Sequence, residues 1–184
     1  MKILLLDSSL HKKDHFSSGN EELDNYIKRY ASQDIKRNLT KVFIAHHKDN
    51  PDIIGYYTLS PFSFCKENLF QDVQKKLPSY PIPAVLIGRL AVSKQDQNKG
   101  VGSALLMDAF TKIHQASETV FGIYAVVVDA IDENAREFYK RFGFISFRDN
   151  SFKLFLPLKT IQNAIKMLNN NEETTHENVL YNAQ

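Results

Sequence analysis

Apolar residues in the first half of the chain follow first a helical and then a strand-like spacing. Within residues 18–30 they fall on one face of a helix, with acidic residues in the first turn and basic residues at the end, as the helix dipole prefers. A second short helix is expected over residues 32–38. The β-rich runs at 41–46 and 53–59 are joined by a polar loop, which predicts a hairpin.

The second half of the chain alternates buried strands with amphipathic helices. A nearly continuous apolar run at 84–92 predicts a central strand that is buried on both faces. It leads through a glycine-containing turn into a helix that is expected over 102–115. The elements expected after this helix are a strand at 124–128, a helix at 132–141 and strands at 143–147 and 153–156. This order predicts an α/β domain with parallel neighbouring strands in this half.

Two segments are less regular. Within residues 62–83, a helix is suggested at 68–77, but three prolines between residues 78 and 83 force an extended approach to the next strand. Near the end of the chain, a short helical stretch grades into a polar tail that we expect to be mobile. We therefore divide the chain into a domain over residues 1–158 and a short helix with a tail over 159–184.

Composition and charge fit one globular domain. Hydrophobic residues make up 43% of the 184 residues and charged residues 24%, which argues against a disordered chain or a fibrous repeat. The formal net charge of +2 is too small to indicate nucleic-acid binding by itself, so local clusters decide that question. The apolar residues 3–6 are too few for the core of a signal peptide, and no later run approaches the length of a membrane span. We therefore expect a cytoplasmic protein without membrane contact.

The chain has a single cysteine, Cys65, which excludes an internal disulfide and a metal site built from several cysteines. No catalytic constellation is visible around this residue, so we expect an ordinary packed thiol rather than a nucleophile. A lone cysteine also fits a reducing compartment. We expect no metal site.

A turn with two glycines connects the strand at 84–92 to the helix that follows. It reads Gln97-Asn98-Lys99-Gly100-Val101-Gly102. Backbone N–H groups at a helix N-terminus can converge on an anion, and without a Cβ at Gly100 and Gly102 the main chain can approach a diphosphate closely. The string matches neither the dinucleotide pattern G-x-G-x-x-G nor the triphosphatase pattern G-x-x-x-x-G-K-[ST]. The alternative is a tight turn in which the glycines serve backbone geometry alone.

The order Gln-x-x-Gly-x-Gly, placed between a hydrophobic strand and an amphipathic helix, resembles the coenzyme A signature of GNAT acetyltransferases. Residues 126–130 and 134–144 resemble the closing strand, helix and strand of that family, and the likeness covers roughly residues 41–157. An amphipathic helix ended by a glycine cap at Gly143 is the plainer interpretation of the second block, and both can hold. The resemblance implies a single-domain GNAT fold. Its mixed, strongly twisted central sheet is flanked by helices, with a V-shaped splay between two parallel central strands.

The resemblance also implies acetyl-coenzyme A as the cosubstrate, and it assigns the residues that bind it. These are Leu90, Ala91, Val92, Gln97, Asn98, Lys99, Gly100, Val101, Gly102, Ser103, Asn134 and Phe138. Pantetheine would lie in the splay between the strands at 84–92 and 124–128. Backbone N–H groups of residues 90–92 would stabilise the tetrahedral oxyanion, and Tyr139 would donate a proton to the departing thiolate.

No general base is evident in the sequence. His46, His47 and His114 are expected to be solvated or structural. A lysine side chain, with a reference pKa of about 10.4, is protonated at neutral pH, whereas an α-amino group at about 7.7 to 8.0 supplies free amine without help. The sequence therefore favours an α-amine as the acceptor.

A narrower likeness links three segments, 16–26, 87–92 and 154–158, to GNAT-type toxins from bacterial type II toxin–antitoxin pairs. Such toxins acetylate the amino group of an aminoacyl-tRNA, which blocks translation, and a small ribbon-helix-helix antitoxin silences them. The chain departs from them at Ser18, where cysteine is common, and in its longer tail. The resemblance implies aminoacyl-tRNA as the acceptor and such an antitoxin as a partner, while pairing into a homodimer stays open.

Basic residues are concentrated in one segment of the chain. Residues 25–48 carry six bases against one acid, Asp34. Such a patch can hold an RNA backbone, and it can equally be the solvated face of a helix. The residues that we assign to contact with the acceptor or its tRNA are Lys28, Arg29, Lys36, Arg37 and Arg89. Further bases at 136–141 are offset by neighbouring acids and carry less weight.

Two other functions stay open. An acetyltransferase for a protein N-terminus or a small amine would use the same coenzyme residues with an acidic or apolar acceptor groove. A non-catalytic module that binds acyl-CoA or an antitoxin would need no proton donor, so the presence of Tyr139 argues against it.

Overall fold

The computed structural model describes residues 1–48 and 50–167. Within them the chain forms one sheet of seven strands in the order β1-β2-β3-β4-β5-β7-β6. The strands are β1 (Lys2–Leu5), β2 (Lys41–His46), β3 (Ile53–Phe64), β4 (Ile82–Val92), β5 (Ala125–Asp129), β6 (Ile145–Ser146) and β7 (Lys153–Pro157). Of the neighbouring strand pairs in this part of the chain, β4 and β5 alone run parallel. The predicted α/β class with a mixed central sheet is confirmed.

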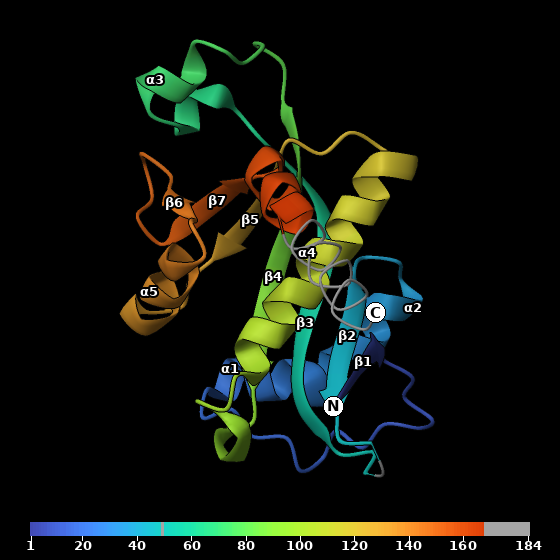
Figure 1. Cartoon of the computed structure of the whole chain (residues 1–184). Helices are drawn as coiled ribbons and strands as arrows, with labels where there is room; N and C mark the ends of the chain where they lie inside the picture. Colours follow the sequence, from blue (N-terminus) through green and yellow to red (C-terminus); the bar gives the residue numbers. More distant parts are fainter. Residues whose placement is uncertain (49, 168–184) are drawn as a thin grey trace, which may run out of the picture.

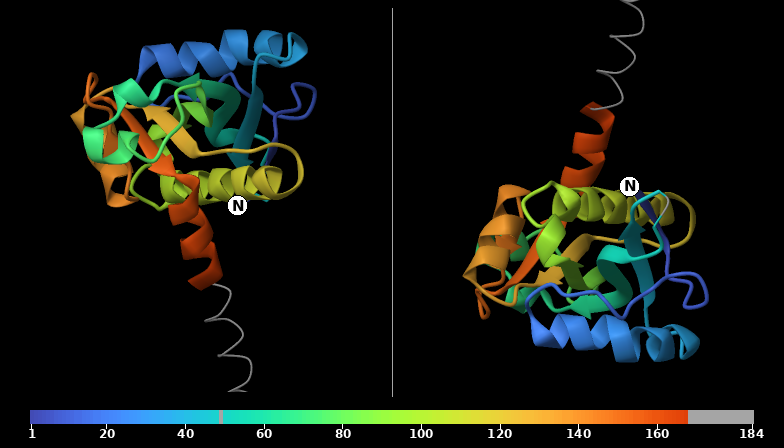
Figure 2. Two further views of the ribbon diagram at one scale, coloured as in Figure 1. Left: turned by 90° about the horizontal axis from the view of Figure 1, so that it is seen from above. Right: turned by 90° about the horizontal axis from the view of Figure 1, so that it is seen from below.

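Helices cover both faces of the sheet. They are α1 (Glu21–Asn25), the π-helix η1 (Tyr26–Tyr30), α2 (Ala31–Lys36), the 3₁₀-helices η2 (Lys66–Asn68) and η3 (Lys94–Asp96), α3 (Gln71–Gln74), α4 (Val101–Thr119), α5 (Glu133–Arg141) and a helix at 158–167. Figure 2 shows α1, η1 and α2 as one layer on one side of the sheet and α4 on the other. Figure 1 shows α3 at one end of the molecule, and α1 and the start of α4 at the other.

Successive residues of the central strand β3 point into two separate cores. Tyr56 packs with Tyr26 and Ile27 beneath the α1 layer, and Tyr57 packs with Leu105 of α4. Both β3 tyrosines have no exposed surface. Because side chains alternate across a strand, burial on both faces is what gives β3 and β4 their nearly unbroken apolar sequence.

The parallel strands β4 and β5 separate partway along β4. Their pairing runs from Ala84 opposite Ala125 to Ile87 opposite Val128, whereas β4 continues to Val92 beside β3 only. Where the pairing stops, β3 and β4 shift register, and the additional residue lies on β4 at positions 88–89. A β-bulge of this kind bends a strand and increases its twist. The predicted splay between the two parallel central strands is therefore present.

Several predicted boundaries move. The helix expected over 18–30 begins at Glu21 and becomes a π-helix at Tyr26. The run expected at 53–59 continues as a strand to Phe64, α4 extends to Thr119, and the helix suggested at 68–77 is reduced to α3. The first strand, β1, was not predicted; it pairs with β2 at the edge of the sheet.

Cys65 corrects one prediction. It was expected to be packed, but it is exposed, because it follows the last residue of β3 at the end of the sheet that carries α3. Its backbone N–H donates to Oδ1 of Asn68 at 3.0 Å, so this region is held by a local turn rather than by burial of the thiol.

The end of the described chain packs on the α4 side of the sheet. Leu158 and Ile161 belong to the same core as α4, and Ile165 packs against it. The division after residue 158 stays a prediction, and the tail expected beyond residue 167 lies outside the described residues. Among the helices of residues 1–48 and 50–167, none is apolar enough over a sufficient length to span a membrane.

Candidate active site

A cavity of about 920 Å³ opens where β4 separates from β5. Its walls come from the end of β4, the turn that follows it, the start of α4, the loop before α1, and α5. The predicted site residues that line it are Leu90, Ala91, Val92, Gln97, Asn98, Gly100, Gly102, Ser103, Asn134, Phe138 and Tyr139. The fold thus brings together most of the residues assigned to coenzyme and catalysis.

Two residues of the predicted coenzyme set do not line the cavity. The side chain of Lys99 is 64% exposed and lies 3.5 Å from the Asp96 carboxylate. Val101 is buried in the core beneath α4.

The turn before α4 presents backbone N–H groups to the cavity. Gly100 is the N-cap of α4 with a φ of 83°, and it supplies no side chain to cap the first turn. The first intrahelical bond described runs from Ala104 N to Gly100 O at 3.0 Å. The first N–H groups of a helix have no partner within it, and together with the helix dipole they attract an anion. The turn therefore has the donors for a diphosphate.

The two glycines differ in what the fold requires of them. Gly100 occupies the left-handed region, so its backbone conformation alone accounts for glycine. A Cβ at Gly102 would lie 3.6 Å from Val92 Cγ2 and 3.8 Å from the Phe138 ring, which is ordinary van der Waals contact. The protein itself does not exclude a side chain at position 102. The packing of the described residues therefore does not by itself require glycine at position 102.

The free edge of β4 supplies further donors. Arg89 N donates to Thr58 Oγ1 at 3.1 Å, and Ser93 N donates to Ile54 O at 2.8 Å, so both N–H groups face β3. Because N–H groups alternate in direction along a strand, those of Leu90 and Val92 point to the opposite edge. That edge faces the gap left by β5. The sequence assigned the N–H groups of residues 90–92 to this role, but by the same alternation that of Ala91 faces β3.

Tyr139 lies in the wall formed by α5. The helix begins at Asp132, whose Oδ1 accepts from Ala135 N at 2.7 Å. Tyr139 is 5% exposed, and its ring packs against Phe138 and Phe144 with centroids 5.2 and 5.4 Å apart. Burial, and to a smaller extent the charge of Asp129, raise the pKa of its phenol. The hydroxyl makes no hydrogen bond with a described residue, and with its raised pKa it is protonated at neutral pH.

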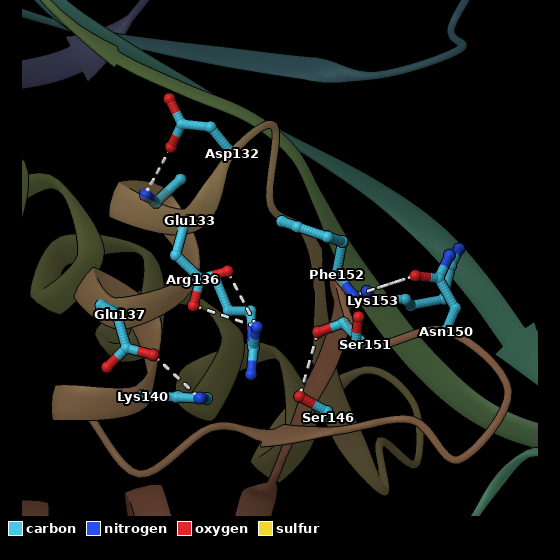
Figure 3. A network of polar contacts seen from close by, with 11 residues as sticks. Asp132, Glu133, Arg136, Glu137, Lys140, Ser146, Asn150, Ser151, Phe152 and Lys153 are labelled. Atoms are coloured by element: carbon cyan, nitrogen blue, oxygen red, sulfur yellow. Dashed lines mark hydrogen bonds and ion pairs between the residues drawn. The ribbon is translucent and has the colours of Figure 1, made fainter.

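Most charges on α5 are neutralised locally, as Figure 3 shows. Arg136 and Lys140 each lie 2.8 Å from a carboxylate, that of Glu133 and that of Glu137. Arg141 is the base of this helix that lines the cavity. The sequence predicted that the bases at 136–141 are offset by neighbouring acids, and these two ion pairs agree with that prediction.

The five residues assigned to the acceptor lie outside the cavity lining. Lys28 and Arg29 are on η1, and Lys36 and Arg37 are at the end of α2, where Lys36 lines a separate groove beside β1. Arg89 lies in the β4 bulge, and its guanidinium carbon is 3.8 Å from the centroid of the Tyr26 ring. None of these five residues is therefore among those that line the cavity.

The loop before α1 contributes to the cavity, whereas the histidines named from the sequence do not. His46, His47 and His114 do not line the cavity, whereas Ser18, Gly19, Asn20 and Leu23 do. The sequence did not assign these four residues to a site. The sequence signal for a tight turn at this position is Gly19, which has a φ of 92° in the structure.

Comparison with known proteins gives one family and consistent neighbours. Residues 38–146 match the acetyltransferase (GNAT) domain. A tRNA-acetylating toxin of Mycobacterium tuberculosis (strain ATCC 25618 / H37Rv) is 31% identical over 144 residues, which is 78% of this chain and 84% of that protein. The structure of AtaT complexed with acetyl-methionyl-tRNAfMet has a TM-score of 0.81 at 30% identity, over 89% of this chain and 98% of that one. A mutant AtaT toxin bound to the C-terminus of the antitoxin AtaR and acetyl-CoA has a TM-score of 0.76 at 27% identity, over 89% and 97% of the two chains.

Proposed function

The chain belongs to the acetyltransferase (GNAT) family, and we propose that it transfers the acetyl group of acetyl-coenzyme A to the α-amino group of an aminoacyl-tRNA. Acetylation of that amine prevents peptide-bond formation, so the protein would act as a toxin that blocks translation. The proposal is supported by the similarity to a tRNA-acetylating toxin and to AtaT bound to an acetylated aminoacyl-tRNA.

One observation carries the catalytic part of the proposal. Residues of the unpaired edge of β4, the first turn of α4 and Tyr139 all line one cavity of about 920 Å³. The diphosphate of acetyl-coenzyme A fits the N–H groups of residues 101–103, and pantetheine fits the open edge of β4. This arrangement leaves the thioester near Leu90 and Tyr139.

The chain's own groups then account for each step. The acceptor nitrogen attacks the thioester carbon, and the N–H groups of Leu90 and Val92 stabilise the negative charge that develops on oxygen. As the carbon–sulfur bond breaks, Tyr139 donates its proton to the sulfur, and the proton lost by the acceptor nitrogen passes through water to the resulting phenolate, which restores the phenol. An α-amine with a pKa of about 7.7 to 8.0 supplies free amine without a base, which agrees with the lack of a histidine among the described residues that line the cavity.

The acceptor face is proposed to include Lys28, Arg29, Lys36, Arg37 and Arg89. The four helical bases are on the surface of η1 and α2, and Arg89 is half-buried beside the cavity. A ribbon-helix-helix antitoxin is proposed as the protein partner, supported by the antitoxin complex of AtaT. A homodimer stays a prediction, and light scattering on the purified protein tests it.

A transfer assay tests the proposal directly. The protein is incubated with radiolabelled acetyl-CoA and with charged tRNA, uncharged tRNA, a peptide mixture with free N-termini, or polyamines. We expect label in the charged tRNA alone, and its release together with the amino acid when the ester is hydrolysed. Label in peptides or polyamines without label in charged tRNA would establish the alternative acetyltransferase, and label in none of the acceptors would favour a binding module.

A further inference from the structure

Arg89 is held in a stack of side chains from three elements. Its guanidinium carbon lies 3.8 Å from the centroid of the Tyr26 ring, on η1. On β3, the Tyr56 ring stacks with Tyr26 at a centroid distance of 6.1 Å and an interplanar angle of 23°. Tyr26 is 3% exposed and Tyr56 has no exposed surface. The two rings form a fixed base that restricts the position of the arginine.

The guanidinium keeps its hydrogen-bond donors available. Within residues 1–48 and 50–167, Arg89 forms no ion pair with a carboxylate and its side chain donates no hydrogen bond. By contrast, Arg136 and Lys140 on α5 are paired with acids. An arginine that stacks on an aromatic face retains a planar set of N–H donors that matches a phosphate. Arg89 is thus a preorganised cation without a partner in the described protein.

The position of Arg89 separates it from the coenzyme diphosphate. It lies in the β4 bulge, three positions before Val92, which corresponds to about 10 Å along a strand. The turn that faces the diphosphate begins only after Val92. Arg89 is therefore near the end of the site where the acetyl group and the acceptor amine meet.

We infer that Arg89 binds a phosphate at the 3′ end of the acceptor tRNA and that Tyr26 is the positioning residue that holds the guanidinium for this contact. The inference rests on the proposed function, since it concerns the acceptor of the same reaction. The last nucleotides of a charged tRNA are single-stranded, so their phosphates can enter a half-buried site that a duplex cannot reach. The hydroxyl of Tyr26 meets no partner at hydrogen-bond geometry among the described residues, but burial and then the nearby Asp34 carboxylate raise its pKa. We assign the positioning role to the ring, which contacts the guanidinium directly.

Four variants and one control test this inference. Arg89→Gln and Tyr26→Leu remove the cation and its base, Arg89→Lys keeps the charge without the planar group, and Tyr26→Phe keeps the ring. Lys2→Gln removes an exposed cation from the far edge of the sheet. For each protein, kcat and KM are measured for charged tRNA and for acetyl-CoA, and the tRNA measurements are repeated over a range of KCl concentrations.

The expected result is specific to one substrate. Arg89→Gln raises KM for charged tRNA by about 10- to 100-fold, the range for loss of hydrogen bonds to a charged group, Tyr26→Leu raises it by a smaller factor, and both leave KM for acetyl-CoA unchanged. In Arg89→Gln the slope of log kcat/KM against log salt becomes shallower by about 0.7, the value for one phosphate of a single strand. Arg89→Lys restores part of the salt slope, Tyr26→Phe restores KM, and Lys2→Gln behaves as the wild type.

Each contrary outcome has a distinct meaning. Wild-type transfer to charged tRNA with an unchanged KM in Arg89→Gln overturns the inference and leaves the proposed function intact. A rise in KM for acetyl-CoA instead would assign Arg89 to the coenzyme, and an equal loss in Tyr26→Phe and Tyr26→Leu would reject the ring as the support. Absence of wild-type transfer to charged tRNA overturns the proposed function together with the inference. If Tyr26→Leu does not fold, the two Arg89 variants and Tyr26→Phe decide the outcome.

Discussion

The side-chain amide of Gln97 donates a hydrogen bond to the main-chain oxygen of Ser18 at 2.8 Å, which joins two segments that are distant in the sequence. The same Nε2 lies 3.1 Å from the oxygen of Val92, at the end of β4. A main-chain bond from Lys94 N to Ser17 O, 2.8 Å long, runs beside this contact. Gln97 therefore fixes the loop at residues 18–20 against the turn at residues 97–102 and closes that side of the cavity.

Replacement of Gln97 by alanine should loosen this wall without abolishing the fold. Loss of two exposed hydrogen bonds should lower the free energy of unfolding by about 0.5–1.5 kcal/mol and weaken acetyl-CoA binding severalfold. Chemical denaturation and calorimetry measure the two effects. Gln33→Ala is the matched control, because Gln33 also donates from its amide to a main-chain oxygen, that of Arg29 at 3.0 Å, but on the α2 surface. Equal acetyl-CoA affinity in both variants would contradict the role given to Gln97.

Alanine substitutions at the two glycines of the turn should separate folding from ligand binding. Gly100→Ala places a side chain at a φ of 83° and should destabilise the protein by about 1–2 kcal/mol. Gly102→Ala meets protein atoms no closer than 3.6 Å, so stability should be kept or raised. Its methyl group should block the approach of the diphosphate to the main chain and reduce acetyl-CoA affinity by about tenfold or more, as expected for the loss of charge-assisted hydrogen bonds. Thermal unfolding and calorimetry on both variants test this; normal affinity in Gly102→Ala would show that no ligand approaches the main chain there.

Tyr139→Phe should reduce turnover while leaving the binding of acetyl-CoA intact. Removal of a general acid is expected to lower kcat by about 10²- to 10⁴-fold. The hydroxyl has no hydrogen-bond partner in the described protein and the ring is retained, so folding and acetyl-CoA affinity should change little. Release of free thiol in single-turnover experiments measures the effect. Tyr30→Phe, at a tyrosine that is 53% exposed, serves as the control. Undiminished turnover in Tyr139→Phe would assign the proton to water or to another group.

The elements that were predicted correctly are those whose conformation is indicated by residues within the element itself. The apolar run at 84–92 and the glycines at 100 and 102 each identify their conformation within a few residues. The contact of Tyr139 with the same cavity followed from the resemblance, because nothing near Tyr139 in the sequence points to the glycine turn.

The parts that were missed depend on contacts between distant segments. The loop at 18–20 enters the cavity only because it bonds to residues 94 and 97. The strand β1 is a four-residue run whose extended form depends on its pairing with β2. The stack of Arg89 on Tyr26 requires both the bulge in β4 and the π-helix η1, and neither has a distinct sequence pattern.

His11 should make stability depend on pH near neutrality. It is 7% exposed, and its Nδ1 accepts a hydrogen bond from Asp7 N at 3.0 Å, so the folded protein holds it neutral. Burial and then the nearby His46 lower its pKa below the ordinary value of 6.5, while the Asp7 carboxylate partly opposes them. The unfolded chain therefore binds a proton at His11 more readily than the folded protein does. The contribution of neutral His11 to stability is present above pH 6.5 and is lost as the pH falls through the lower pKa of the folded state.

Urea denaturation at pH 7.5 and at successively lower values should accordingly give a free energy of unfolding that falls as the pH decreases below neutrality. His11→Gln, whose side chain can still accept from Asp7 N but does not titrate, should flatten this part of the profile. His15→Gln, at an exposed histidine four residues further along, should leave the profile as it is in the wild type. Because acid also protonates carboxylates at lower pH, the comparison rests on the difference between the two variants over the range in which His11 titrates. An identical profile for His11→Gln and the wild type would mean that the buried imidazole does not control this dependence.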